Sequence, residues 1–172
     1  MKRIIILDGA GRHDGRTSAL VRAFTEGAEQ AGNEVIRFEL QEMDIRGCRN
    51  CQGCAGQEKG IPLPCVQRDD MDEIYRAFRE AQVIVLASPI YWWTVSGPLK
   101  TAVDRLYALI RNAGKDAYPK ESVLLMTAGS TDYSQAVAWY SRFEPWLGWK
   151  DLGMILGANQ AETARELGAG IR

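Results

Sequence analysis

The stretch VIVLAS, residues 83–88, is apolar almost without interruption and rich in β-branched side chains. A half-exposed strand would alternate apolar with polar residues, so this pattern predicts a strand buried on both faces of a sheet. Four further runs read as strands: residues 3–8, 34–40, 122–127 and 152–157. The run 34–40 (EVIRFEL) alternates, which is typical of a strand at or near the edge of a sheet.

Helical patterns separate these runs. They cover residues 16–31, 70–81, a segment beginning at Gly97-Pro98, residues 131–140 and a short final stretch. Asp70 and Glu73 have the spacing of a capping box. Strand–helix alternation with continuous apolar strands predicts one α/β domain over residues 1–172. We expect a flavodoxin-like, doubly wound, five-stranded parallel sheet of order 2-1-3-4-5, with helices on both faces and a ligand crevice beyond the strand C-termini.

Composition excludes several classes of protein. The chain has 172 residues, of which 46% are hydrophobic, with 21 Lys+Arg against 22 Asp+Glu. A net charge of −1 provides no basic surface for nucleic acid and no strong acidic field for steering a redox partner. The apolar run before Asp8 has only four residues, and no stretch approaches about 18 apolar residues, so we expect a cytoplasmic protein without a membrane partner.

The loop after the first strand, residues 8–18, is a candidate phosphate site. Its glycines permit tight turns, two arginines can neutralise a dianion, and backbone N–H groups open the next helix. It has neither the P-loop spacing nor G-x-G-x-x-G, which disfavours ATP and a Rossmann dinucleotide. The candidate residues are Gly9, Ala10, Arg12, Arg16, Thr17 and Ser18. The alternative is an ordinary strand–helix turn with solvated arginines. The lone histidine, His13, lies in this loop and is expected to be a solvated residue rather than a ligand contact.

An aromatic loop follows the strand at 83–88. Three consecutive aromatic residues cannot all face one core, so at least one should reach the crevice and provide a flat wall for a heteroaromatic ring. The candidates are Ser88, Pro89, Ile90, Tyr91, Trp92 and Trp93. Alternatively, these aromatics fill an interface with another subunit.

The two loops together resemble the NADPH-dependent FMN reductase and iron–sulfur flavoprotein family of the flavodoxin-like superfamily. Four of the family's motifs occur in order: G-S-P-R-x-x-G-N-T as Gly9, Arg12, Gly15 and Thr17, D-D-M as Asp69-Asp70-Met71, S-P-I-Y as Ser88–Tyr91, and L-K-x-x-x-D-R as Leu99-Lys100 and Asp104-Arg105. The chain departs from the first motif, with Ala10 and Gly11 in place of Ser and Pro and Arg16 in place of Asn.

The resemblance implies FMN, with its phosphate over residues 10–18 and its ring along Pro89–Trp93. The ring would also lie against the loop Thr127-Ala128-Gly129-Ser130, where the N–H groups of Ala128 and Gly129 are candidates to face its pyrimidine edge. NAD(P)H is the implied co-substrate. The flavin carries the chemistry, so no catalytic side chain is predicted.

All four cysteines lie in a long segment without periodicity, at Cys48, Cys51, Cys54 and Cys65. The spacing C-x2-C-x2-C-x10-C suits a [4Fe–4S] cluster, zinc is chemically feasible, and free or redox-active thiols lining the flavin entrance are the third interpretation. The final gap is longer than in the iron–sulfur branch of the family.

The sequence supports three hypotheses about function. The first is an FMN-dependent NAD(P)H oxidoreductase that reduces a small acceptor such as a quinone, a flavin or a nitroaromatic compound. The second is an iron–sulfur flavoprotein that relays electrons between FMN, a [4Fe–4S] cluster and a protein partner such as ferredoxin. The third is a binding module that has lost the flavin. The resemblance also implies a homodimer or homotetramer, with the C-terminal aromatics as core or subunit contact, and Asp104 and Arg105 as an ion pair.

Overall fold

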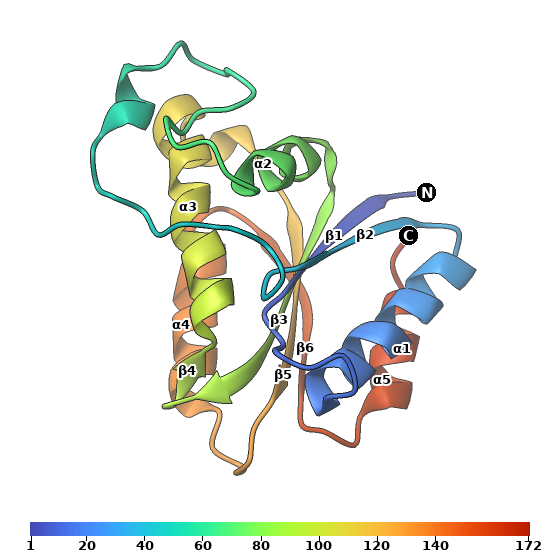
Figure 1. Cartoon of the computed structure of the whole chain (residues 1–172). Helices are drawn as coiled ribbons and strands as arrows, with labels where there is room; N and C mark the ends of the chain where they lie inside the picture. Colours follow the sequence, from blue (N-terminus) through green and yellow to red (C-terminus); the bar gives the residue numbers. More distant parts are fainter.

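The computed structural model describes residues 1–172 and is built around a parallel sheet (Figure 1). Its strands are β1 (Arg3–Asp8), β2 (Glu34–Glu39), β3 (Val83–Tyr91), β4 (Thr94–Val95), β5 (Glu121–Thr127) and β6 (Lys150–Leu156). Five of them are parallel, in the order β2-β1-β3-β5-β6, and the short β4 pairs antiparallel with β3. The predicted doubly wound arrangement is therefore confirmed, with one additional strand.

Helices cover both faces of this sheet. Five α-helices are present: α1 (Arg16–Gln30), α2 (Met71–Glu80), α3 (Gly97–Ala113), α4 (Ser134–Trp146) and α5 (Ala161–Ala169), with short 3-10 turns at Gly53–Gly56 and Lys115–Ala117. Helices α1 and α5 lie together on one face, and α2, α3 and α4 lie on the other (Figure 1). None of the helices combines the length and the apolar character needed to span a bilayer.

The central strands explain the unbroken apolar runs in the sequence. Strands β1, β3 and β5 have neighbours on both edges and helices on both faces, so nearly every side chain along them is buried. Successive side chains point to opposite faces, so each strand contributes to both hydrophobic cores. Strand β2 is an edge strand and is mostly half-buried, as its alternation predicts.

A tight hairpin replaces the aromatic loop expected after residue 88. Strand β3 continues to Tyr91, and its pairs Ile90–Val95 and Tyr91–Thr94 leave only Trp92 and Trp93 in the turn. Both tryptophans have positive φ, 50° and 63°, as a type I′ turn requires. Type I′ turns usually have Asn or Gly at these two positions, so two tryptophans gave no sequence signal for a turn here.

Two helix ends differ from the prediction. The capping box at Asp70 is wrong: the Asp70 carboxylate accepts from the Asp44 N–H at 2.7 Å, and the Met71 N–H donates to Asp69 at 3.3 Å. Helix α4 continues beyond the predicted end at residue 140 to Trp146, because Phe143 still packs on the core there.

Candidate functional site

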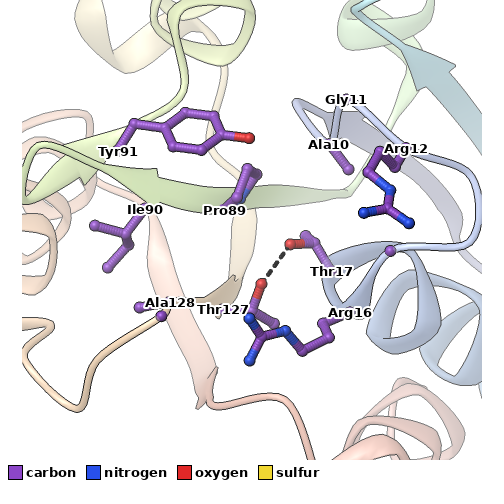
Figure 2. Close-up of a pocket in the computed structure, with 12 residues that line it drawn as sticks. Ala10, Gly11, Arg12, Arg16, Thr17, Pro89, Ile90, Tyr91, Thr127 and Ala128 are labelled. Atoms are coloured by element: carbon purple, nitrogen blue, oxygen red, sulfur yellow. Dashed lines mark hydrogen bonds between the residues drawn. The ribbon is translucent and has the colours of Figure 1, made fainter.

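A cavity of about 220 Å³ lies beyond the carboxyl ends of β1, β3 and β5, where the predicted crevice was expected (Figure 2). Three loops contribute to its wall: the loop before α1, the end of β3 and the loop after β5. The lining residues are Ala10, Gly11, Arg12, Gly15, Arg16, Thr17, Pro89, Ile90, Tyr91, Thr127, Ala128 and Gly129. Ten of the fifteen predicted cofactor residues are therefore brought together here.

The N-terminus of α1 gives one end of the cavity an affinity for anions. The helix begins after Gly15, which has no side chain to cap it, and its first turn contains no acidic residue. The first N–H groups of a helix have no partner within it, and the helix dipole places partial positive charge there. Arg16 and Thr17 are the first two residues of this turn, so the donor set fits a phosphate group.

The two arginines of the loop differ in their partners. Arg12 forms an ion pair with Asp14, whose carboxylate lies 3.1 Å from the Arg12 Nε. Arg16 takes part in no ion pair, and its side chain lines the cavity (Figure 2). Arg16 is therefore the unpaired cation of this site.

A buried hydroxyl pair joins two of the loops. Thr17 Oγ1 and Thr127 Oγ1 are 2.6 Å apart, and both residues are buried (Figure 2). One of these hydroxyls donates to the other, so the start of α1 is tied to the end of β5. This contact fixes the floor of the cavity, a role that the sequence alone did not suggest for Thr127.

Five predicted residues do not line the cavity. Gly9, Ser18 and Ser88 lie beneath the loops, while Trp92 and Trp93 are exposed at the hairpin tip. The Ser18 hydroxyl donates to the carbonyl of Arg12 at 2.6 Å. The Ser88 hydroxyl donates to the Pro89 carbonyl and accepts the Ser96 N–H at 2.8 Å. These two serines therefore hold the cavity walls in shape from behind.

Gly9 permits the close approach of β1 to the start of α3. A Cβ at this position would lie 2.3 Å from the Ser96 Oγ and 2.9 Å from the Leu99 Cβ. The Ser96 hydroxyl also donates to the Gly9 carbonyl at 2.9 Å. A side chain at position 9 would push the first loop and the start of α3 apart.

The loop after β5 contains a partner that sequence reasoning missed. The Ala128 N–H, expected to be free for a flavin, donates to the Tyr133 hydroxyl at 3.1 Å. The Gly129 N–H has no protein acceptor, and a Cβ at Gly129 would meet open space. Of the two predicted donors, Gly129 alone is free in this structure.

Charged side chains hold the first loop against strand β2. The Asp8 carboxylate accepts from the Ala10 N–H at 2.9 Å and from Arg37 at 2.7 Å. Burial raises the pKa of Asp8, although both contacts favour its ionised form. His13 extends the attachment, because its two ring nitrogens lie 3.1 Å from Glu39 and 2.7 Å from Glu42. The lone histidine is exposed but is not simply solvated.

The four cysteines line a separate, small cavity of about 30 Å³ beside α3, and none of them lines the crevice. Cys48 and Cys51 are exposed, Cys54 is half-buried and Cys65 is buried, all as free thiols. Burial raises the pKa of Cys54, and the other three thiols raise it further because they lie close by. The cysteines therefore belong to a cavity distinct from the crevice, and their role as free thiols at a flavin entrance stays a prediction.

The geometry of the cysteines distinguishes between metals. No three of their sulfur atoms lie within 4.8 Å of one another. Tetrahedral zinc, with bonds of about 2.3 Å, would bring all four sulfurs closer than that. A [4Fe–4S] cluster spaces its thiolates more widely because each binds a different iron. The four thiols are therefore gathered at one cavity but do not have the close spacing of a tetrahedral zinc site.

Asp104 and Arg105 do not pair with each other. Adjacent residues on a helix point about 100° apart, so Asp104 faces solvent and accepts from Lys100 at 2.6 Å, whereas Arg105 is buried. The partner of Arg105 is Asp69, from the D-D-M motif, at 2.7 Å. Burial opposes ionisation of Asp69, but hydrogen bonds from Arg105 and the Arg46 N–H outweigh it and lower the pKa of Asp69. The predicted ion pair is therefore wrong in its partner.

Helices α3 and α4 border an apolar groove of about 620 Å³. Trp139 stacks on Phe143 with ring centroids 5.3 Å apart, and Phe143 meets Trp149 edge-on. Trp149 is buried, whereas Trp146 is 58% exposed at the rim. The C-terminal aromatics thus form both core and surface.

Comparison with known proteins gives a consistent result. A family model described as NADPH-dependent FMN reductase matches residues 2–158. An iron–sulfur flavoprotein of Archaeoglobus fulgidus is 36% identical over 106 residues, which are 62% of this chain and 46% of that protein. An iron–sulfur flavoprotein of Methanocaldococcus jannaschii is 33% identical over 103 residues, 60% of this chain and 51% of that protein. The matches thus span about half the length of these relatives.

A solved structure shares the fold. An NAD(P)H:quinone oxidoreductase from Methanothermobacter marburgensis superposes with a TM-score of 0.75 at 20% identity, covering 99% of each chain. At that identity the likeness concerns the fold alone.

Proposed function

Because this chain belongs to the NADPH-dependent FMN reductase family, we propose that its crevice holds FMN and that the protein oxidises NAD(P)H. The observation that carries this proposal is the cavity at the ends of β1, β3 and β5, with an uncapped helix N-terminus and one unpaired arginine at the same end. The compound that it reduces would be a small acceptor such as a quinone, a flavin or a nitroaromatic compound.

The protein's task in this reaction is to bind and orient. FMN supplies the chemistry when bound, accepting a hydride from the nicotinamide and passing two electrons to the acceptor. Arg16 and the first N–H groups of α1 would hold the phosphate. Pro89, Ile90 and Tyr91 supply the wall for the ring, and the Gly129 N–H supplies a donor for its pyrimidine edge, where negative charge accumulates on reduction.

The visible spectrum of anaerobically purified protein tests this proposal. We expect flavin absorption bands that NADPH bleaches, and a colourless protein that ignores added FMN would support the binding-module hypothesis instead. Arg16→Gln should weaken FMN binding by about tenfold to a hundredfold, the value of a charge-assisted hydrogen bond. Arg76→Gln, at an exposed position on α2 away from the cavity, is the matched control.

We propose as a second function that the four cysteines hold a [4Fe–4S] cluster and that the protein relays electrons from the flavin to a protein partner such as ferredoxin. Two observations favour it: all four thiols line one cavity, and two relatives bear the name iron–sulfur flavoprotein. The cavity is small, so the segment has to widen to admit a cluster. Iron and sulfide analysis after anaerobic reconstitution tests it, and sub-stoichiometric iron would refute it.

We propose that the protein forms a homodimer or homotetramer through the apolar groove between α3 and α4. Most of the residues that line this groove are hydrophobic, and Tyr107 and Trp146 lie exposed at its rim, which suits contact with a second copy of the chain. Light scattering on a sizing column should give a mass above 19.1 kDa. Trp146→Glu should lower that mass, and a wild-type monomer would refute the proposal.

A further inference from the structure

Arg105 is a cation almost wholly removed from solvent, with 1% of its side chain exposed. Its Nη1 donates to the Arg46 carbonyl at 2.6 Å and to Asp69 at 2.7 Å, and its Nη2 donates to Asp69 at 3.1 Å. Arg46 and Asp69 stand at the two ends of the segment that carries every cysteine. One guanidinium on α3 therefore fastens both ends of that segment.

These contacts leave one nitrogen of Arg105 without any partner. The Nε atom is buried and has no hydrogen-bond partner. A buried donor without an acceptor costs about 1–3 kcal/mol, and native proteins rarely leave one without a reason. Arg105 also lines the cavity that is lined by all four cysteines. The unused donor thus belongs to Arg105, which is the one fully buried residue with a permanent positive charge in the wall of this cavity.

Cys65 is the cysteine that belongs to the buried part of this wall. It is the only buried one of the four, and the hydroxyl of neighbouring Tyr75 donates to the Arg105 carbonyl at 2.9 Å. Arg105 and Cys65 are therefore both buried residues of the wall of this cavity.

We propose that Arg105 is a positioning residue for the cluster, donating its Nε–H to the Cys65 sulfur and thereby raising the cluster's reduction potential. The inference rests on the [4Fe–4S] site proposed above. Reduction adds one electron from the reduced flavin to the cluster and makes it more negative by one charge. A hydrogen bond to sulfur stabilises the reduced form, as outer-shell contacts do at other metal sites.

Arg105→Lys separates this role from fastening the segment. Lysine keeps the charge opposite Asp69 but has no Nε–H and no planar fork. A double variant, Arg105→Gln with Asp69→Asn, removes both charges without leaving either one buried alone. Arg111→Lys, exposed on the same helix, is the matched control. Circular dichroism of each variant establishes that it is folded.

The experiment is a redox titration, followed by electron paramagnetic resonance, of anaerobically reconstituted protein with its iron content measured in parallel. We expect the midpoint potential of the bound cluster to fall in both Arg105 variants, by a tenfold change in the one-electron equilibrium, or about 59 mV, in Arg105→Lys. The control should keep the wild-type potential.

The outcomes are distinguishable. A merely structural Arg105 would lower the iron content but leave the potential of the remaining clusters unchanged, and that result would overturn the inference while the proposed cluster stands. Wild-type protein that takes up no iron would overturn the cluster and the inference together.

Discussion

The close approach at Gly9 gives the sharpest test of how the crevice is built. In Gly9→Ala the new Cβ would lie 2.3 Å from the Ser96 Oγ and 2.9 Å from the Leu99 Cβ, so the first loop or the start of α3 must move. Overpacking of this kind costs about 1–3 kcal/mol, and losing the Ser96–Gly9 hydrogen bond costs about 1 kcal/mol. We expect the free energy of unfolding to fall by about 2–4 kcal/mol.

Thermal unfolding of the FMN-free protein measures this loss without a contribution from the cofactor. For a chain of this size each kcal/mol shifts Tm by roughly 2–4 °C, so Tm should fall by roughly 4–16 °C. Gly11→Ala is the control within the same loop, because no atom lies within 4 Å of its added Cβ, and it should leave Tm unchanged or slightly raised.

A double variant locates the strain. Ser96→Ala removes the nearer of the two clashing atoms, so Gly9→Ala with Ser96→Ala should be more stable than the two single losses added together, by at least about 1 kcal/mol. The Leu99 contact would remain, so rescue should be partial. An unchanged Tm in Gly9→Ala, or strict additivity in the double variant, would refute the packing that places the first loop against the start of α3.

Three further changes test other parts of the structure. Burial lowers the pKa of Lys120 to about 8 from 10.5. Between these two pH values the unfolded chain binds more protons than the folded one, so the free energy of unfolding, measured in urea, should rise with pH by at most about 3 kcal/mol. Lys120→Met should remove this rise. Thr127→Val breaks the buried pair with Thr17 and should cost about 1–2 kcal/mol in urea unfolding while weakening FMN binding, and equal affinity would contradict the placement of the floor. Trp92→Asn with Trp93→Gly should raise Tm, because these residues suit positive φ; a lower Tm would show that the tryptophans stabilise the hairpin.

The parallel sheet was predictable because burial on two faces leaves a direct trace in the sequence. Strands β1, β3 and β5 are sandwiched between helices and read as unbroken apolar runs, while β2 at the edge alternates. The crevice then follows from the order of the strands, since parallel strands end at one edge of the sheet. Ten predicted residues line the cavity because they lie in the loops that follow those strands, and these loops are brought together at that edge.

Details that depend on side-chain direction were not predictable in this way. The hairpin of β3 and β4 has tryptophans at its two turn positions, where turn statistics favour Asn and Gly, so nothing in the local sequence announced it. Asp104 and Arg105 are neighbours in sequence but face different surroundings on α3, and the true partner of Arg105, Asp69, lies 36 residues away. Long-range pairing of this kind leaves no local signal.

The two arginines of the first loop show what this limit means for binding. In sequence Arg12 and Arg16 are equivalent cations, and together they would balance the two negative charges of a phosphate ester. In the structure Asp14 already neutralises Arg12, so Arg16 supplies one free positive charge. The remaining attraction must come from the uncapped N–H groups that open α1, whose dipole is weaker than a full charge but is fixed in direction. FMN binding should therefore depend more on the backbone of this loop than its arginines suggest, and more on Arg16 than on Arg12.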